Sequence, residues 1–437
     1  MRYAPAVIIG RAVRAAARIR KPGGGSAVPG LVVNKLAPGY LAHALNSFPR
    51  GLVIVSGSSG KSTTTKMLVS VLRAHGIRIF TNPSTANISQ GLTSALLEQA
   101  DVRGRIDAEL GVLEMDEGHG ALIADRLTPS VVVLTNVMID QIDRFHDPQM
   151  VQGMLAKIAR RASAAVVLNA DDQSLLELAS GLRGTAEARW FGVSHGVRVA
   201  NPRGFGYAET APEASAVTAE TVVERVDGAR TTITVAGEAM DVALPSRGVH
   251  YAVDAAAALS AAREILGDGF EPARAIEAIG AMEPVFGRGE TTTVRGRKVE
   301  FVLVQNPASF QLNVDSLPAG TEQIMVAIGS DVRDPSYLWP VDTASLGRVR
   351  VVSGSQAQEI ALQLAYDGVS IDRIEENLAT ALDDFLALPE PSSGGGVKTV
   401  IFSADSMRRT RAHLGLTSNS DGAGGAGSST STGGAGV

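Results

Sequence analysis

The chain has 437 residues, of which 45% are hydrophobic, and this length predicts two or three α/β domains rather than one core. It contains no cysteine, which excludes disulfides, thiolate metal sites and cysteine nucleophiles and fits a reducing compartment. No run of about 18 uncharged apolar residues is present, and Arg11, Arg14 and Arg18 interrupt any signal-peptide core, so we expect a cytoplasmic protein without a membrane span.

Charge is distributed unevenly along the chain. The net charge is −5, yet residues 1–97 contain 12 Lys/Arg and no acidic residue, because the first acid is Glu98. The remaining 340 residues carry 28 bases and 45 acids, a net −17. A basic N-terminal part suits an anionic ligand, whereas the acidic remainder lacks an aromatic-rich basic stretch and argues against a nucleic-acid partner.

The first 45 residues are predicted to form a basic N-terminal unit. Residues 1–21 carry six bases and read as a short helix that ends at Pro22 and a glycine run. Two interpretations stay open, namely contact with an anionic membrane surface or polyphosphate lipid, and a solvated helix that packs on the body by its alanine face. Residues 26–50 are interpreted as a connector that is helical over 40–45.

The most informative stretch is 52–65. An apolar, β-branched run leads into GSSGKST (57–63), and an amphipathic helix is predicted over 62–75. Strand, glycine-rich loop and helix in this order predict a phosphate-binding loop, since glycines let backbone N–H groups surround phosphate oxygens and the helix N-terminus adds partial positive charge. Lys61 would reach the terminal phosphates, and Ser62 or Thr63 would hold Mg²⁺. The full pattern requires glycine where Val55 stands, so an ordinary glycine/serine turn is the alternative.

Further predicted strands also end in polar loops. Strand 77–80 leads into TNPSTAN (81–87), a strand that ends near 114 leads into EMDE (114–117), and strand 130–134 leads into TNVMIDQIDR (135–144). Carboxyl ends of parallel strands meet at the edge of the sheet where ligands bind. Glu114 is a natural Mg²⁺ ligand there, because hard cations prefer carboxylate oxygens; the alternative for EMDE is a set of solvated acids that open a turn.

The fold class is predicted as α/β. Strand–loop–helix units up to residue 180, the last of them with a strand over 164–168 that ends in NADD (169–172), predict a parallel, doubly wound sheet in a domain over 46–284. An antiparallel, β-rich insert at about 188–245 is expected to pad this domain. A smaller α/β domain over 285–416 and a disordered Gly/Ser tail over 417–437 are expected to follow. In the smaller domain the predicted strands are 299–304, 323–328, 349–352 and 398–402, and the predicted helices are 356–366 and 372–388.

The motifs together resemble a known family. GSSGKSTT, TNPSTAN, LEMDE, TNVMIDQIDR and NADD, in this order, resemble the central ATPase domain of the Mur ligase family, which includes folylpolyglutamate synthase. The C-terminal segments GRGE, QNPASF and SDVRDPSYLWPVD are similar to those of the MurT-type ligase subunits, as is the basic helix followed by GGGSAVPG. The resemblance covers roughly residues 1–415.

The resemblance implies an ATP- and Mg²⁺-dependent carbon–nitrogen ligase of peptidoglycan synthesis. MurT-type subunits phosphorylate the α-carboxylate of D-glutamate in the lipid II stem peptide, and ammonia then displaces the phosphate. A GatD-like glutamine amidotransferase supplies the ammonia by means of a cysteine, which this chain lacks. The implied partners are therefore this amidotransferase, as a heterodimer, and lipid II at the membrane surface, with peripheral contact to the inner face of the plasma membrane left open.

The resemblance also implies roles for individual residues. Lys61, together with Mg²⁺ held by Ser62 and Glu114, would neutralise charge on the transferred phosphoryl group. Asp334 matches the aspartate that orients the partner's catalytic histidine, with Asp331 as the alternative. The implied nucleotide contacts are Gly57, Ser58, Ser59, Gly60, Lys61, Ser62, Thr63, Asn87, Asn136 and Arg288.

The chain departs from the family pattern in four places. The four-cysteine zinc ribbon of most MurT-type chains has no counterpart in 190–245, so we expect no structural zinc. HYAVD (250–254) stands in place of an asparagine-rich motif, which leaves the adenine contacts open. Gln305 replaces a lysine, and Tyr337 replaces a tryptophan.

Two metal-site assignments and two other functions stay open. Lys157 lies near the position of the carbamylated lysine of other Mur ligases, at an uncertain offset, and Gln141 stands where many of them have a metal-binding histidine. An amino-acid-adding ligase, such as a polyglutamate ligase, would need an amino-acid pocket and no partner. A nucleotide-binding scaffold without catalysis is the other alternative, in view of Val55, Gln305 and Tyr251.

Overall fold

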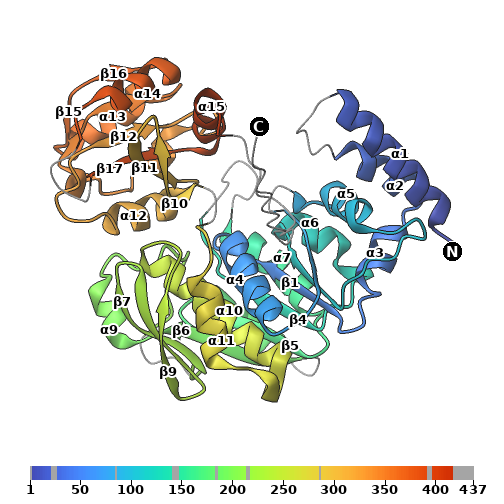
Figure 1. Cartoon of the computed structure of the whole chain (residues 1–437). Helices are drawn as coiled ribbons and strands as arrows, with labels where there is room; N and C mark the ends of the chain where they lie inside the picture. Colours follow the sequence, from blue (N-terminus) through green and yellow to red (C-terminus); the bar gives the residue numbers. More distant parts are fainter. Residues whose placement is uncertain are drawn as a thin grey trace, which may run out of the picture.

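The computed structural model describes residues 2–20, 27–83, 86–139, 147–182, 186–212, 217–284, 287–390 and 396–416. Within these ranges the chain forms two α/β units, each built on its own sheet, and helices near the N-terminus pack on the larger unit (Figure 1). No helix in these ranges is long and apolar enough to cross a bilayer.

The larger sheet has nine strands in the described part of the chain, in the order β2-β3-β1-β4-β5-β6-β7-β8-β9. Neighbours from β2 to β7 pair in parallel, and β8 and β9 continue the sheet in antiparallel fashion. The chain passes from β1 to β2 on one side and later crosses to β4 on the other, so the carboxyl end of β1 lies at the switch point where such sheets bind ligands. The strands are β1 (Leu52–Ser56), β2 (Ile79–Thr81), β3 (Leu110–Glu114), β4 (Val131–Leu134), β5 (Ala165–Asn169), β6 (Glu187–Val193), β7 (Thr221–Asp227), β8 (Arg230–Val235) and β9 (Glu238–Ala243).

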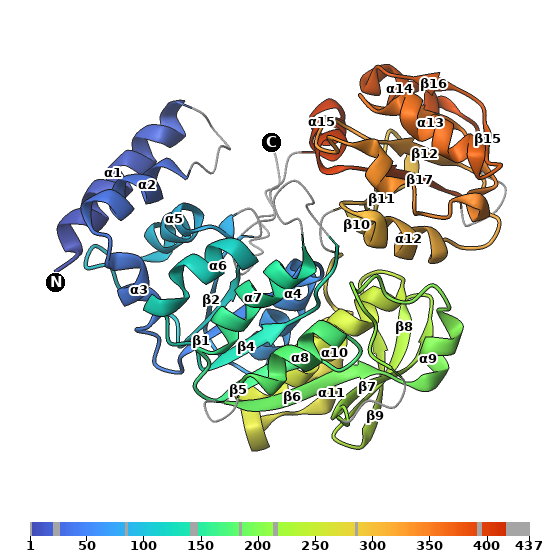
Figure 2. The same cartoon turned by 180° about the vertical axis from the view of Figure 1, so that it is seen from behind.

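Helices cover both faces of this sheet, which is why its central strands are apolar throughout (Figures 1 and 2). One core lies under α4, α10 and α11, where the alanines of α10 let it approach α4 closely. The other core lies under the helices on the opposite face. The helices of the first face are α4 (Lys61–Ala74), α10 (Val249–Leu266) and α11 (Pro272–Gly280); α9 (His195–Ala200) packs on β7; the helices of the other face include α5 (Ser89–Gln99), α6 (Glu117–Ile123), α7 (Pro148–Ala159) and α8 (Gln173–Ser180).

Three helices precede β1, namely α1 (Ala4–Arg20), α2 (Val28–Leu36) and α3 (Tyr40–Leu45). The expectation of a connector that is helical only over 40–45 was wrong, because α2 begins with Pro29 in its first turn, where proline's fixed φ favours a helix start. Gly30 lets α2 approach α5: a Cβ at this position would lie 1.9 Å from the Gln90 carbonyl oxygen.

The antiparallel, β-rich character expected for about 188–245 is confirmed for β7 to β9, but the expectation that this region is an insert that pads the larger unit was wrong. β6 pairs in parallel with β5, and β7 pairs in parallel with β6, so this region extends the main sheet instead. The short runs at 221–226, 231–235 and 240–244 do form strands, but their half-buried alternation does not say which sheet they join.

The smaller unit has a six-stranded sheet in its described residues, in the order β10-β11-β17-β12-β14-β16. The GRGE segment opens strand β10, whose first residue is Arg288. The predicted strand 349–352 is interrupted at Arg350, and the predicted helix 372–388 begins only at Leu378, where the Asn377 side chain caps it. The elements are β10 (Arg288–Val294), β11 (Arg297–Leu303), α12 (Pro307–Asp315), β12 (Ile324–Ala327), β13 (Arg348–Val349), β14 (Val351–Ser353), α13 (Ala357–Tyr366), β15 (Ser370–Ile371), β16 (Ile374–Glu375), α14 (Leu378–Ala387), β17 (Val397–Phe402) and α15 (Ala404–Leu414), with short 3₁₀ helices η4 (Pro335–Leu338) and η5 (Ala344–Leu346).

Polar contacts tie the two units together. Arg247, just before α10, pairs with Glu300 on β11, and its Nη2 lies 2.7 Å from Glu300 Oε2. The Arg247 Nε also donates to the Ser316 carbonyl oxygen at 2.9 Å. At the outer rim Arg203 pairs with Asp315 and Asp342. The two units are therefore joined by the buried pair of Arg247 with Glu300 and by the exposed ion pairs of Arg203 with two aspartates.

Replacing Arg247 with methionine should destabilise the protein. The Glu300 side chain is 4% exposed, and removing its cation would leave a buried carboxylate without an ionic partner, which costs about 3–5 kcal/mol. We expect the midpoint of thermal unfolding, measured by scanning calorimetry, to fall by several degrees. The matched control is Arg230→Met on the exposed edge of β8, and equal losses in both variants would contradict the role of the pair.

Candidate functional site

The loop between β1 and α4 is held in a backbone conformation that favours glycine. Gly57 and Gly60 have φ values of 133° and 80°, in the region that side chains disfavour. Space is also restricted, since a Cβ on Gly57 would lie 2.2 Å from Thr135 Oγ1 and a Cβ on Gly60 would lie 2.1 Å from Asp254 Oδ1. A side chain at either position would therefore be strained and would clash with its neighbours, so the loop requires glycine at both positions.

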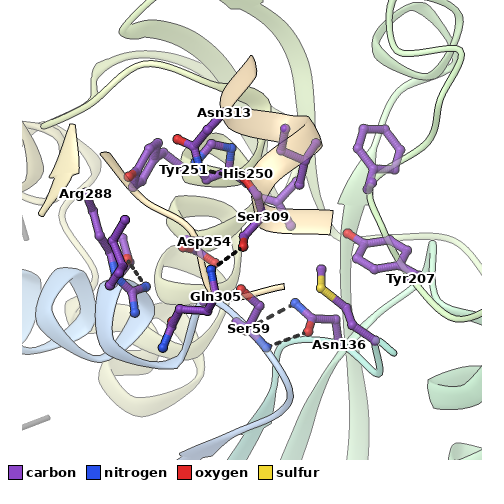
Figure 3. Close-up of a pocket in the computed structure, with 17 residues that line it drawn as sticks. Ser59, Asn136, Tyr207, His250, Tyr251, Asp254, Arg288, Gln305, Ser309 and Asn313 are labelled. Carbon is purple, nitrogen blue, oxygen red and sulfur yellow. Dashed lines mark hydrogen bonds between the residues drawn. The ribbon is translucent and has the colours of Figure 1, made fainter. Parts of the chain in front are cut away.

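The end of β4 positions this loop (Figure 3). The Ser59 N–H donates to Asn136 Oδ1 at 2.9 Å, and Asn136 Nδ2 donates back to the Ser59 carbonyl at 3.2 Å. The Ser58 N–H donates to the Asn136 carbonyl, and Ser58 Oγ accepts from the Met138 N–H, both at 3.0 Å. Asn136 therefore sits beside the loop, as the sequence predicts, and its side chain holds the loop in shape.

Lys61 is the first residue of α4, and its ammonium group points back into the loop. Its Nζ donates to the carbonyl oxygens of Gly57 and Ser58 and lies 3.2 Å from Glu117 Oε2. The side chains of Lys61 and Glu117 are only 13% and 2% exposed, so this is a buried ion pair. Glu117, in the first turn of α6, is a site residue that the sequence reasoning named only as part of an acidic run.

Glu114 ends β3 directly opposite Val55 of β1. Its carboxyl group is buried, and burial raises its pKa, while the Ser62 hydroxyl and the charges of Lys61 and Arg288 act in the opposite direction. Asn87 Nδ2 lies 3.5 Å from Glu114 Oε1. Ser62 and Glu114 thus bring a hydroxyl and a carboxylate oxygen together at the start of α4, a donor set that suits Mg²⁺.

Within the described ranges no group of three or more His, Cys, Asp or Glu could hold a metal ion. A cation at Ser62 and Glu114 would therefore take its other ligands from water or from a bound phosphate, as Mg²⁺ commonly does. Asp116 instead caps α6, because it accepts from the His119 N–H and contacts the His119 ring Nδ1, both at 3.0 Å. For Asp116 the alternative of an acid that opens a turn is the better description. The expectation of no structural zinc stays a prediction.

A pocket lined by residues of both units opens beside the loop (Figure 3). The larger unit contributes the loop, the start of α10 and a segment after α9, and the smaller unit contributes the end of β11 and α12. Its wall combines aromatic and aliphatic side chains with several polar groups, as small-molecule sites do. The lining residues include Ser59, Gly60, Thr63, Asn136, Tyr207, His250, Tyr251, Asp254, Arg288, Gln305, Ser309 and Asn313.

The first turns of α10 place the titratable side chains of His250, Tyr251 and Asp254 at this pocket. Burial lowers the pKa of His250 to about 3, so the ring is neutral, and its Nδ1 has no hydrogen-bond partner among the described residues. Burial also raises the pKa of Asp254 to about 8, against the opposing charge of Arg288. Asp254 and Tyr207 were not predicted as site residues. A single acid early in an otherwise apolar, alanine-rich helix was the signal for Asp254.

Arg288, the first residue of β10, reaches the site from the smaller unit. Its Nη1 donates to Thr63 Oγ1 at 3.3 Å, and its charge acts on Glu114 and Asp254. The structure thus brings the predicted residues Thr63, Glu114 and Arg288 together. Gln305 lines the pocket as well, with an uncharged side chain where the family has a lysine.

Other predicted residues lie elsewhere. Asp172 caps α8 and accepts from the Val137 N–H at 2.6 Å. The NADD segment thus holds the loop that follows β4 in place and has a structural role. Lys157 pairs with Asp125 at 3.2 Å on the last turn of α7, which leads to the amino edge of the sheet, so the structure does not bring it to the phosphate loop. Gln141 and the rest of 140–146 lie outside the described residues, as do 84–85 and the tail 417–437.

Asp334 lies on the surface of the smaller unit and does not line the pocket. It caps η4, and its Oδ1 accepts from the Ser336 N–H at 3.0 Å and from Ser336 Oγ at 2.6 Å. Asp331, the alternative, accepts from Ser403 Oγ at 2.6 Å, which ties it to the end of β17.

Comparison with protein families finds two matches. Residues 55–262 match the Mur ligase middle domain, and residues 303–394 match the MurT ligase C-terminal domain. The "Lipid II isoglutaminyl synthase (glutamine-hydrolyzing) subunit MurT" of Streptococcus pneumoniae is 24% identical over 395 residues, which are 81% of this chain and 85% of that protein. The same subunit of Staphylococcus aureus is 32% identical over 158 residues, so the match spans about a third of either chain. A UDP-N-acetylmuramate–L-alanine ligase of Mycobacterium marinum is 32% identical over 53% of this chain and 43% of its own length.

Solved structures share the fold. MurF from Acinetobacter baumannii superposes with a TM-score of 0.65 at 17% identity and covers 89% of this chain and 80% of its own. Folylpolyglutamate synthase of Mycobacterium tuberculosis, a structure in complex with ADP and AMPPCP, has a TM-score of 0.61 at 18% identity and covers 89% and 99% of the two chains. At these identities the likeness concerns the arrangement of the chain.

Asp254→Asn should change how stability depends on pH. The native pKa of about 8 lies above the ordinary 3.8, so the native state retains a proton that the unfolded chain releases, and stability is lost as pH rises between these values. The asparagine variant lacks this titration. We expect its thermal midpoint to fall less than that of the unmodified protein from about pH 5 to about pH 8.

The control for this measurement is Asp107→Asn, whose side chain is 93% exposed and should leave the pH profile unchanged. Parallel profiles for the Asp254→Asn variant and the unmodified chain would mean that Asp254 is ionised in the native protein throughout this range.

Proposed function

Because this chain belongs to the Mur ligase family and its C-terminal unit is of the MurT type, we propose that it is the ATP-dependent ligase subunit that amidates the α-carboxylate of D-glutamate in lipid II, with ammonia from a glutaminase partner. One observation carries the proposal: a phosphate loop of the larger unit and a MurT-type C-terminal unit share one pocket (Figure 3).

The residues around the loop suit transfer of a phosphoryl group. The loop N–H groups and the start of α4 would receive the ATP phosphates. Lys61 and Arg288 would face negative charge on the transferred group from two sides. Ser62 and Glu114 would hold Mg²⁺, which neutralises phosphate charge when it is bound. His250, neutral because it is buried, offers the rest of the nucleotide an Nδ1 that has no hydrogen-bond partner in the described part of the chain.

The reaction would proceed in two steps. An oxygen of the D-glutamate α-carboxylate attacks the γ-phosphorus, the bond to the β-phosphate oxygen breaks, and ADP leaves behind an acyl phosphate. Ammonia then attacks the acyl carbon, inorganic phosphate leaves and a proton is lost, which gives the amide. Both steps require that water be kept from the acyl phosphate, and a pocket walled by both units suits this requirement.

The surface around Asp334 suits a protein partner. The Asp334 carboxylate is exposed and its orientation is fixed by Ser336. The same unit exposes three large apolar side chains, Trp339 (43%), Leu362 (52%) and Tyr366 (74%), and the Trp339 and Tyr366 rings are 5.4 Å apart. Exposed aromatic groups of this kind mark interaction sites. A glutaminase docked there would gain a carboxylate that can orient its catalytic histidine.

Two other functions make different predictions for one reconstitution experiment. The chain is mixed with a candidate glutaminase, lipid II, glutamine and ATP, and the products are analysed by mass spectrometry. Our proposal expects amidated lipid II only when both proteins are present. An amino-acid-adding ligase, which similarity to UDP-N-acetylmuramate–L-alanine ligases suggests, would extend its substrate without the partner. A nucleotide-binding scaffold would release no ADP.

Lys61→Ala should abolish ATP-dependent turnover. The variant loses the cation that faces the phosphates, and loss of one such group reduces the rate by about 10²–10³-fold or more. ADP release in the reconstituted reaction is the measurement. Lys157→Ala, which removes an exposed lysine far from the loop, is the control and should keep full activity. Amidation that persists in Lys61→Ala would disprove the assignment of this loop.

Asp334→Asn should reduce glutamine hydrolysis by the complex while ATP binding by this chain stays intact. An amide cannot stabilise the charged histidine of the partner, and comparable substitutions reduce the rate by about 10⁴-fold. Asp331→Asn is the matched variant, because that carboxylate is already bound to Ser403. If hydrolysis falls only in Asp331→Asn, the role passes to Asp331.

A further inference from the structure

Helix α1 is fixed to the body by one face. Ala6 and Val7 are buried, and Gly10 allows close contact, since a Cβ there would lie 2.5 Å from Val33 Cγ2 and 2.8 Å from Leu97 Cδ1. Arg14 pairs with Glu98 on α5. These contacts fix the rotation of the helix about its axis, so the side chains on its opposite face are exposed. The helix lies at the edge of the molecule (Figures 1 and 2).

The outward face of α1 is mainly apolar, and Arg11 is the one fully exposed charge among the α1 residues whose side chains the structure describes. A stripe at the helical spacing of three and four residues is exposed along its length, although a surface helix ordinarily presents charged or polar groups there. Ile8 and Ile9 are 54% and 44% exposed. The members of the stripe are Pro5, Ile8, Ile9, Ala12, Ala15 and Ala16.

Helix α2, which packs along α1, adds more exposed apolar groups. Val28, Leu31 and Leu36 are 50%, 42% and 58% exposed. We call Ile8, Ile9 and these three residues the apolar face of the helix pair. Solvated helices have little reason to expose five large aliphatic side chains, and such exposure usually indicates an interaction surface.

The charges next to the apolar face are positive. Arg2, just before α1, and Lys35 on α2 are exposed, and Arg11 is exposed as well but donates to the Ala100 carbonyl oxygen. No acidic residue precedes Glu98, which Arg14 already neutralises. A protein partner would require matching acids around an apolar centre. An anionic bilayer offers both parts at once, with acyl chains for the aliphatic groups and lipid phosphates for the cations.

We propose that α1 and α2 seat this protein on the surface of an anionic lipid bilayer. Ile8, Ile9 and Leu31 enter the boundary between headgroups and acyl chains, and Arg2 and Lys35 pair with lipid phosphates. The helices lie on the surface and do not cross it. This inference does not depend on the amidation chemistry, and its test uses vesicles that contain no lipid II.

The test is co-sedimentation of the full chain with vesicles of phosphatidylcholine that contain about 30% phosphatidylglycerol. We expect binding that weakens about tenfold or more in pure phosphatidylcholine or at high salt, because screening removes the contribution of the cations. The variant Ile8→Glu/Ile9→Glu/Leu31→Glu should lose binding. Binding that is unaffected by the three substitutions would overturn the proposal.

A control variant of equal charge is Leu122→Glu/Met150→Glu/Val199→Glu, which alters exposed apolar residues elsewhere and should retain binding. Equal losses in both variants would show that only net charge matters and would overturn the role of the apolar face. If the unmodified chain is a dimer by size exclusion, does not bind vesicles and becomes monomeric in the α1/α2 variant, a second copy covers the apolar face and the proposal is wrong.

A second measurement does not depend on how well a triple variant folds. The chain has no cysteine, so Ile9→Cys can be labelled at one site with a polarity-sensitive fluorophore. We expect the emission to shift to the blue when phosphatidylglycerol vesicles are added, and no shift for the same label at Val199→Cys. No shift at either position would refute insertion of the apolar face.

Discussion

The close approach of Gly60 to Asp254 determines much of this molecule. A side chain at position 60 has no room, so the phosphate loop lies directly against the first turns of α10. This contact buries Asp254 and brings the pocket-lining residues His250 and Tyr251 to the loop. Arg288 completes the arrangement from the other unit. Burial keeps His250 and Asp254 in their neutral forms near pH 7, and the charge of Arg288 acts on both with little screening by water.

The α/β fold of the Mur ligase type was predictable and is confirmed, because its signals are local. An apolar strand, a glycine-rich loop and an amphipathic helix are adjacent in the chain, and their alternation specifies a parallel sheet. The sheet membership of β6 to β9 was not predictable, since a half-buried strand shows alternation whichever sheet it joins. Likewise, the only local signal that divides the short strands β15 and β16 from helix α14 is Asn377, whose side chain caps that helix.

The site could be predicted only in its local part. The loop residues and Glu114 follow strands directly, so the rule for sheet edges places them together. The pairing of Lys61 with Glu117 could not be predicted from the sequence. Three acids lie within residues 114–117, and only the packing of α6 beside the loop determines which of them contacts Lys61. Asp116 faces its own helix and caps it. The position of Asp254 depends on how α10 packs on α4, which the sequence pattern of α10 does not specify.

The contacts between the two units differ in what it costs to separate them. Glu300 is almost completely buried, so separating it from Arg247 would leave a buried carboxylate without its cation. Arg203 is 48% exposed, and water can readily replace its aspartate partners. Thermal motion will therefore part the units first at Arg203 and last at Arg247. The exposed contacts of Arg203 also weaken as ionic strength rises, whereas the buried pair of Arg247 and Glu300 is screened much less, so salt should loosen the two contacts unequally.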